Sequence, residues 1–466
     1  MLFTSVDFLI FFGVVLALLA AIRDSRSRFW IVLTASYVFY AAWDWRLLGL
    51  LVACSLWNWW LGLKIEDAET PKGRKTAMIV AVTLNLTALG FFKYFNFFVD
   101  SFEALFEIRS TGALSIILPL GISFFTFQGI SYVVDIYRRT KPATRDLVTF
   151  LFFKAFFPQL IAGPIVRAPE FMPQLARPFW MKRYLIISGA QYFLAGAVSK
   201  LVLADNLAYA VDWIFADPAK FDTPTLWLGL LAYTGQIFCD FFGYSMMAIG
   251  LARIMGYRLP INFRMPYVSL DIQEFWRRWH ITLSNWLRDY LYIALGGNRK
   301  GAVRTYANLG LTMLIGGLWH GASWSFVLWG GLHGGALILN RLWSRHVPRE
   351  KRMPALLAWA VTFLFVMIAW VPFRAPNWDT TMTYLRGLAG LGDGTAHWPY
   401  APALIVLAIV AVWHLYYFFG PRWQRSLAGF RHPGRFWQMG VLVAAILSII
   451  FFTPLSGTGP FIYFQF

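Results

Sequence analysis

About ten long apolar runs, separated by short polar segments, make up most of this chain. A helix needs about 20 mostly apolar residues to cross the roughly 30 Å hydrocarbon core of a bilayer, so the pattern predicts an all-α polytopic membrane protein. The first run has no basic residue before it, and we expect a retained helix and not a cleaved signal peptide. About ten full transmembrane helices are expected, at 1–22, 29–43, 47–63, 76–92, 114–134, 184–203, 225–254, 354–373, 401–419 and 436–452.

The charged residues assign these helices to sides of the membrane. Hydrophobic residues form 58% of the chain, and 41 Lys and Arg against 23 Asp and Glu give a net charge of +18. The bases lie in short clusters between apolar runs, as at 64–75 and 341–352, which is typical of cytosolic loops and not of a nucleic-acid-binding face. The segment 204–224 is acidic instead and is expected to be a solvated outward loop, with both termini also outside. Its carboxylates are Asp205, Asp212, Asp217 and Asp222.

Three further segments do not fit a simple span. Residues 147–166 contain Lys154 and two prolines, so we expect a re-entrant or interfacial segment beside a cavity, or alternatively one proline-kinked span. Residues 271–295 alternate charges with aromatic rings and predict one helix lying in the membrane interface. Residues 306–339 form two arms that are too short to cross separately, so they are expected to enter the membrane and return to the same side.

Two histidines are the leading candidates for chemistry, because ionisable groups inside a membrane are costly and are by default functional. His320 lies between the two arms of 306–339, among glycines that allow close approach. Its imidazole can accept a proton near neutral pH, and we favour a general base over a hydrogen-bonding link between helices. His280 shares a helix face with Trp276 and Ser284, and both structural pairing and catalysis are open for it. His333 is about 220° around an ideal helix from His320 and is expected to face elsewhere.

Other polar residues are weaker candidates. Gln236 and Asp240 lie mid-span one turn apart and form either a hydrogen-bonded lock between helices or a polar cavity, to which Ser284 and Ser323 are assigned as further lining residues. No residues are spaced as metal ligands, so we expect no metal site. Three arginines of the interfacial helix either meet lipid headgroups or bind the phosphates of a cytosolic donor: Arg277, Arg278 and Arg288.

The sequence around the two histidines resembles a known family. Residues 276–301, WRRWHITLSNWLRDYLYIALGGNRKG, and 318–334, LWHGASWSFVLWGGLHG, are similar to the membrane-bound O-acyltransferase family. Within it, the chain most resembles the bacterial branch that acts in alginate O-acetylation. The resemblance covers nearly the whole chain and indicates a single domain over 1–466. Further matching segments lie at 118–139, 156–167, 370–375 and 460–466.

The resemblance implies a fold and a set of interactions. Helices would surround a central funnel, with His320 as the active-site histidine and His280 at a second, more variable polar position. The acyl donor would be cytosolic acetyl-CoA, used as a substrate with no bound cofactor, and the acceptor would lie outside the bacterial cytoplasmic (inner) membrane. Implied partners are a separate periplasmic acetyltransferase of the Ser-containing, esterase-like kind and the polysaccharide export machinery, besides the lipid bilayer.

We therefore expect an O-acyltransferase that moves an acetyl group from a cytosolic thioester across the membrane, for O-acetylation of an exported polysaccharide such as alginate or cellulose. A hydroxyl becomes nucleophilic when its proton is accepted, and a thioester needs no metal to be attacked. The alternative is a polytopic transporter or flippase for a lipid or polysaccharide precursor, which releases its substrate unchanged. A scaffold for periplasmic enzymes is a third reading, but it gives no reason for a histidine at membrane depth.

The charge pattern makes the topology testable. Single cysteines replacing Gly73 and Thr223, in a chain whose native Cys54 and Cys239 are changed to serine, are expected to react with an impermeant maleimide from opposite sides. The basic loop at 64–75 then faces the cytosol, and the acidic segment 204–224 faces outward. Labelling is compared in intact cells and inverted vesicles, and reaction of both cysteines from one side contradicts the topology.

Overall fold

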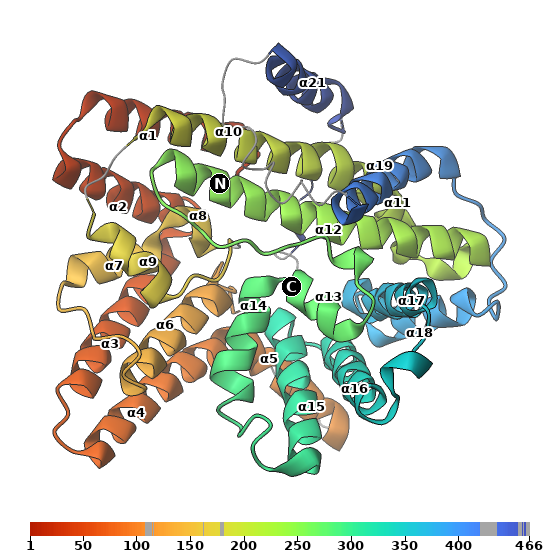
Figure 1. Cartoon of the computed structure of the whole chain (residues 1–466), viewed down its shortest axis with the longest axis horizontal. Helices are drawn as coiled ribbons and strands as arrows, with labels where there is room; N and C mark the ends of the chain where they lie inside the picture. Colours follow the sequence, from red (N-terminus) through yellow and green to blue (C-terminus); the bar gives the residue numbers. More distant parts are fainter. Residues whose placement is uncertain are drawn as a thin grey trace. The chain divides into compact units, whose positions relative to one another are not determined.

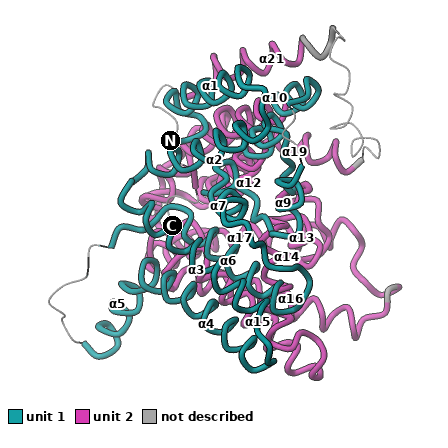
Figure 2. The backbone as a smooth tube through the Cα atoms, turned by 90° about the vertical axis from the view of Figure 1, so that its left-hand side faces the viewer, with its two compact units in different colours: residues 1–190, 248–260 teal, residues 191–247, 261–466 magenta. Residues whose placement is uncertain are grey.

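The computed structural model describes residues 1–107, 114, 116–161, 163–177, 181–419, 436–454, 459 and 461–462. The described chain is helical, and its β structure is limited to one bridge between Phe221 and Ala396, so the predicted all-α class is confirmed. It divides into two compact units, residues 1–190 with 248–260 and residues 191–247 with 261–466 (Figure 2). The assignment of a single domain over the whole chain stays a prediction.

The first unit is formed by the N-terminal helices, in which α6 packs against α3 and α4. Local signals start several of these helices. Thr70 caps α4 by accepting a hydrogen bond from the Gly73 amide, and Pro71 follows in the first turn, where its missing N–H costs nothing. The helices are α1 (Val6–Ala21), α2 (Ser25–Ala41), α3 (Leu48–Glu66), α4 (Pro71–Leu89), α5 (Phe95–Phe106), α6 (Ile122–Tyr137), α7 (Leu147–Ala155), α8 (Phe157–Leu160) and α9 (Ala168–Leu175), followed by the start of α10 (Arg183–Ala197).

The predicted irregular segment at 147–166 is indeed interrupted. The helix stops at Ala155, Phe156 has a non-helical backbone, and the four-residue α8 follows. Lys154 is fully buried and donates to the carbonyl of Phe125. The segment is therefore two short helices joined at Phe156 and not one continuous helix, and its position in the membrane stays a prediction.

The second unit contains the C-terminal helices and most of α12 (Thr223–Ile254). Within it, α15 and α16 lie side by side as a hairpin (Figure 1). Its other elements are the π-helix η3 (Val198–Ala204), α11 (Asp205–Ala216), α13 (Ile272–Arg278), α14 (Ile281–Trp286), the π-helix η6 (Leu287–Tyr292), α15 (Gly301–His320), α16 (Trp324–His346), α17 (Ala355–Arg374), α18 (Trp378–Leu388), α19 (Tyr400–Phe419) and α21 (Phe436–Phe452).

Helices form at all ten of the predicted spans, and they differ in length. Six stretches in the described residues qualify as spans by length and composition: Trp45–Glu66, Pro71–Phe106, Arg183–Ala216, Thr223–Ile254, Ala355–Arg374 and Tyr400–Phe418. The other four, α1, α2, α6 and α21, have 16 or 17 residues. At about 1.5 Å per residue these four are about 25 Å long. The six long apolar helices confirm the polytopic fold class, and the number of about ten full spans stays a prediction.

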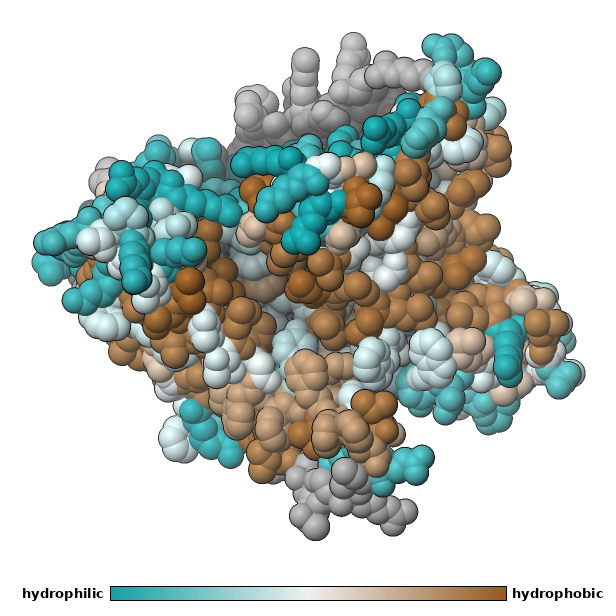
Figure 3. Space-filling model, turned by 90° about the horizontal axis from the view of Figure 1, so that it is seen from below, coloured by the Kyte–Doolittle hydropathy of each residue, from teal (hydrophilic) through white to brown (hydrophobic). Residues whose placement is uncertain are grey.

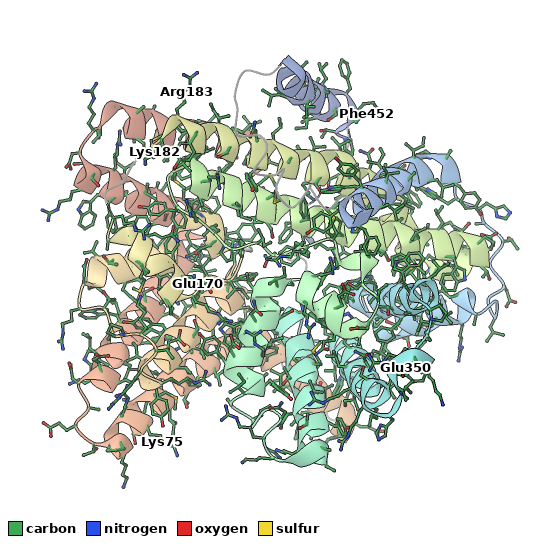
Figure 4. The ribbon with its side chains drawn as sticks, viewed as in Figure 1. Lys75, Glu170, Lys182, Arg183, Glu350 and Phe452 are labelled. Atoms are coloured by element: carbon green, nitrogen blue, oxygen red, sulfur yellow. The ribbon has the colours of Figure 1, made fainter. Side chains whose placement is uncertain are left out.

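The surface of the protein is also that of a membrane protein. Large hydrophobic side chains are exposed on many helices, among them Leu105, Leu356 and Ile450. Figure 3 shows a broad area of hydrophobic residues on one face, with hydrophilic side chains toward its margins. The exposed Lys75 side chain, in the first turns of α4, points away from the first unit (Figure 4). Such an exposed apolar surface matches lipid contact and supports the polytopic membrane assignment.

The acidic segment 204–224 is not the solvated loop that its composition predicts. Residues 205–216 form α11, and Asp205 is buried at its start, where it pairs with Lys200. Asp212, Asp217 and Asp222 are more exposed and pair with a base each, in Arg374, Lys220 and His397. The number of acidic residues in the segment does not show that Asp205 is buried, because Lys200, with which it pairs, lies inside the preceding apolar run.

Two glycines allow the close packing of α15 and α16. A methyl group on Gly317 would overlap the carbonyl oxygen of Phe326, and one on Gly330 would overlap the carbonyl oxygen of Met313. The two backbones therefore pass each other in direct contact, which is a common arrangement in membrane helix pairs.

Gly330→Ala is expected to destabilise the protein by about 1–3 kcal/mol, because the added methyl meets backbone atoms that cannot move aside. Gly335→Ala is the matched control, since it lies on the same helix with nothing near its added methyl group. Alanine is the better helix former by up to about 1 kcal/mol, so the control is expected to be neutral or stabilising. Thermal unfolding of the purified protein in detergent measures both, and equal stability of the two variants contradicts the packing argument.

Candidate active site

His280 lies at a break between two helices of the second unit. The segment 271–295 was expected to be one interfacial helix, but α13 ends at Arg278 and α14 begins at Ile281. Between them His280 has a left-handed backbone, with φ 40° and ψ 56°. The predicted shared face of Trp276, His280 and Ser284 on one continuous helix is therefore wrong, because residues four apart align only when the helix is unbroken.

Asn262 holds this break in place. Its carbonyl oxygen accepts a hydrogen bond from the Ile281 amide at 2.9 Å, and its side-chain oxygen accepts one from the Thr282 hydroxyl at 2.7 Å. Its amide group donates to Ser245 Oγ on α12. A residue distant in sequence thus replaces a hydrogen bond that the interrupted helix loses, as a buried backbone requires.

His320 is the last residue of α15 and is 3% exposed. Aromatic rings surround its imidazole, with centroid distances of 4.9 Å to Trp319, 5.0 Å to Trp329 and 5.2 Å to Phe373. The helix ends there because Gly321 is extended, and a side chain at Gly321 would overlap the ring of Phe326. The hairpin therefore places the imidazole among buried aromatic rings of α15, α16 and α17.

The structure brings the two candidate histidines to the same tryptophan. Trp319 lies 6.0 Å from the His280 ring and 4.9 Å from the His320 ring, measured between centroids. His280 is fully buried and meets the ring of Phe241 on α12 edge-on at 4.6 Å. His280 and His320 therefore flank one indole in the same unit, an arrangement that the sequence spacing alone does not reveal.

His333 belongs to the same cluster, contrary to the expectation that it faces elsewhere. Its ring lies 4.7 Å from Trp329, the residue that also packs against His320. The indole N–H of Trp276 donates to His333 Nδ1 at 3.3 Å, which assigns the proton of the neutral imidazole to Nε2. The helical angle between the two histidines is large, but the wide indole of Trp329 reaches both.

The other predicted site residues lie in varied surroundings. Arg277 is exposed, whereas Arg278 pairs with Glu274 at 2.7 Å. Arg288 pairs with Asp289, and the hydrogen bonds that it donates to that carboxylate raise the pKa of the guanidinium. Ser284 donates to the carbonyl of Trp279, and Ser323 precedes α16 without capping it through its side chain.

Asp240 forms an ion pair that sequence reasoning missed. Lys200 Nζ lies 2.7 Å from a carboxylate oxygen of both Asp205 and Asp240, and all three side chains are buried. Asp240 is thus a charged link between helices, while Gln236, one turn earlier, is half-buried. The available signal was a lysine in the apolar run before Asp205, because a charge inside a span is expected to have a partner.

The chemistry of the site is that of buried imidazoles enclosed by aromatic rings. Within the described residues no three His, Cys, Asp or Glu side chains are arranged to hold a metal ion. A neutral imidazole can take a proton from a hydroxyl, and the surrounding rings exclude water from the reacting atoms. Fold and site together define a polytopic helical membrane protein with a cluster of buried histidines among aromatic rings.

Comparisons with known proteins identify the family. Residues 138–374 match the family model of the membrane-bound O-acyltransferases. The chain is 44% identical over 402 residues to a probable alginate O-acetylase of Azotobacter vinelandii, covering 85% of this chain and 79% of that protein. A probable alginate O-acetylase of Pseudomonas aeruginosa is 45% identical over 399 residues, covering 84% and 75%. A peptidoglycan O-acetyltransferase of Helicobacter pylori is 41% identical over 394 residues, covering 78% and 74%.

The chain therefore belongs to the membrane-bound O-acyltransferase family. It is an O-acyltransferase of the acetyl type, as the names of these relatives indicate. The resemblance noted in the sequence is confirmed.

The hydrogen bond between Trp276 and His333 can be tested by a double-mutant cycle. Trp276→Phe removes the donor and leaves a buried acceptor unpaired, so we expect a loss of about 1–3 kcal/mol. In a His333→Leu background the same change is expected to cost measurably less, because the acceptor is already gone. Thermal unfolding in detergent gives the four stabilities, and strict additivity would show that the hydrogen bond contributes nothing.

Proposed function

We propose that this protein transfers an acetyl group from cytosolic acetyl-CoA to an acceptor hydroxyl at the outer side of the bacterial inner membrane, for O-acetylation of an exported polysaccharide such as alginate or cellulose. The observation that supports the proposal best is the burial of His320 at the end of α15, enclosed by three aromatic rings. An imidazole in this setting is suited to act as a general base. The relatives whose names include alginate O-acetylation support the choice of polymer.

The proposed reaction is a base-assisted acyl transfer. The His320 imidazole accepts the proton of the acceptor hydroxyl as its oxygen attacks the thioester carbonyl carbon. The carbon–sulfur bond then breaks, the sulfur leaves as the thiolate of CoA, and the proton passes to it from the imidazolium. The new carbon–oxygen bond completes the ester, so no redox partner or metal is consumed. His280, on the other side of Trp319, is proposed to orient the reacting groups.

The cytosolic donor carries phosphates, which arginines bind well. Among the three candidates, Arg277 is exposed, while Arg278 and Arg288 are already paired with carboxylates. Arg277 is therefore the first choice for contact with the donor, and lipid headgroups are its alternative partner. Gln236 and Ser323, both half-buried, remain proposed members of a polar wall.

The acetyl group needs a carrier from the membrane to the polymer. We propose as partners a periplasmic acetyltransferase with a nucleophilic serine, and the polysaccharide export machinery. Gene neighbourhood tests this point, since adjacent polysaccharide synthase genes would name the polymer.

His320→Gln is the decisive variant for the reaction. Glutamine can keep a hydrogen bond between helices but cannot accept a proton at neutral pH, so turnover is expected to fall roughly 100-fold or more with expression unchanged. His346→Gln makes the same change at an exposed histidine at the end of α16 and should keep full activity. CoA release by the purified protein with its partner, and O-acetyl content of the exported polymer, are the measurements.

Near-normal turnover of His320→Gln would reject the general-base role of His320. His280→Ala is expected to be milder than His320→Ala, because its proposed role is orientation. CoA release distinguishes an acyltransferase from a transporter, since a transporter moves its substrate intact.

A further inference from the structure

Three buried charged residues of the second unit, Lys200, Asp205 and Asp240, form an ion triad. Asp240 lies on α12, the helix whose Phe241 contacts His280. Lys200 belongs to the π-helix η3, and Asp205 starts α11. Their relative exposures are 5%, 6% and 2%. The helices approach closely enough for these contacts because Gly196 and Gly243 place their backbones against each other.

Burying this triad between helices carries a large desolvation penalty. When all three groups are ionised it carries a net charge of −1, and buried charges contribute less to stability than a well-packed apolar set of the same size. Ionisable groups kept within membrane spans usually serve a purpose other than stability. The question is what else the carboxylates bind.

The second oxygen of Asp240 binds the C-terminal part of the chain. The Ile462 amide donates to Asp240 Oδ2 at 2.7 Å, across 222 residues of sequence. The same part of the chain is held at its start, where Asn206 donates to the carbonyl of Phe452, the residue at the end of α21 (Figure 4). A hydrogen bond to an ionised carboxylate is among the stronger ones, so this contact fixes the position of residues 461–462.

Residues 461 and 462 lie against the aromatic rings that contact His280. Phe461 and Ile462, which we call the strap, are 1% and 3% exposed. Phe461 stacks on Tyr244 at 4.4 Å and lies 5.7 Å from Phe241. Phe241 is the ring that meets His280 edge-on at 4.6 Å, so the strap closes one side of the aromatic wall behind this imidazole.

We propose that the ion triad and the strap are positioning elements for His280. Asp240 anchors the strap through the Ile462 amide, Phe461 fixes the ring of Phe241, and that ring sets the orientation of the imidazole. This inference rests on the proposed function, in which His280 orients the reacting groups. Displacement of a positioned group by about 1 Å can cost up to 100-fold in rate, so a remote anchor of this kind affects turnover more than binding.

The strap can be released without touching the site. Ile462→Pro removes the amide that donates to Asp240, and Ile462→Val is its control, because it keeps the amide and most of the side chain. Phe461→Ala removes the stacking ring, and Phe461→Leu restores much of its volume. In the two disruptive variants we expect a fall in kcat of roughly 10-fold or more, with the KM for acetyl-CoA changed less than about twofold.

Modification by diethyl pyrocarbonate, read by mass spectrometry of peptides, provides a measurement that does not depend on activity. His280 is fully buried and should become reactive in Ile462→Pro and Phe461→Ala. His333 is equally buried, packs against Trp276 and Trp329, and should stay protected, which shows that the fold is intact. The two control substitutions should match the parent protein.

The outcomes separate this inference from the proposed function. If His280 stays protected and kcat is unchanged in Phe461→Ala, or if His280 and His333 become reactive together in that variant, the strap has no specific role and the inference is rejected. That result leaves the general-base role of His320 untouched, because His320→Gln tests it. Conversely, if His320→Gln keeps its turnover, the proposed reaction fails, while the labelling of His280 still shows whether the strap holds it.

Discussion

The constraint on which this structure depends is that a backbone surrounded by lipid or protein cannot leave its hydrogen-bonding groups unpaired. Two irregular elements near the histidines follow it. At the break beside His280, the carbonyl of Asn262 accepts the hydrogen bond of the Ile281 amide. The amide of Ile462, in the C-terminal part of the chain, finds Asp240. In both places a polar residue distant in sequence supplies the hydrogen bond that the irregular backbone needs.

This constraint also explains how far the sequence could predict the fold. Apolar runs place all ten helices, because hydrophobicity is a local property that the chain displays directly. The break at Trp279 and His280 could not be predicted, since the pattern there is helical throughout and Asn262, which supports the break, lies outside the segment. The same holds for Asp205. Its neighbours in sequence mark a loop, whereas its partner Lys200 makes it the buried start of α11.

For the site, the sequence indicated which residues to examine but not how they are arranged. His320 stood out because an ionisable group lay between two short apolar arms. The helical angle between His320 and His333 then predicted separate surroundings. That prediction was wrong because the angle takes no account of the size of the side chains. Trp329 is broad enough for its ring to lie 5.0 Å from one imidazole and 4.7 Å from the other. In a core with so many indole rings, contacts depend on ring size and tilt, which no periodicity encodes.

In the second unit, the aromatic rings around the histidines and the ion triad have different roles: the rings enclose the imidazoles, and the triad anchors the chain. The rings of Trp319, Trp329 and Phe373 pack around the buried imidazole of His320 and shield it from water. Charged groups give stronger and more directional anchors than rings do, but a nearby charge also shifts the proton affinity of a histidine. Asp240, paired with Lys200, anchors Ile462, and the neighbouring Phe461 contacts Phe241, the ring that meets His280. Rigidity can thus be transmitted to the imidazole by the packing of aromatic rings.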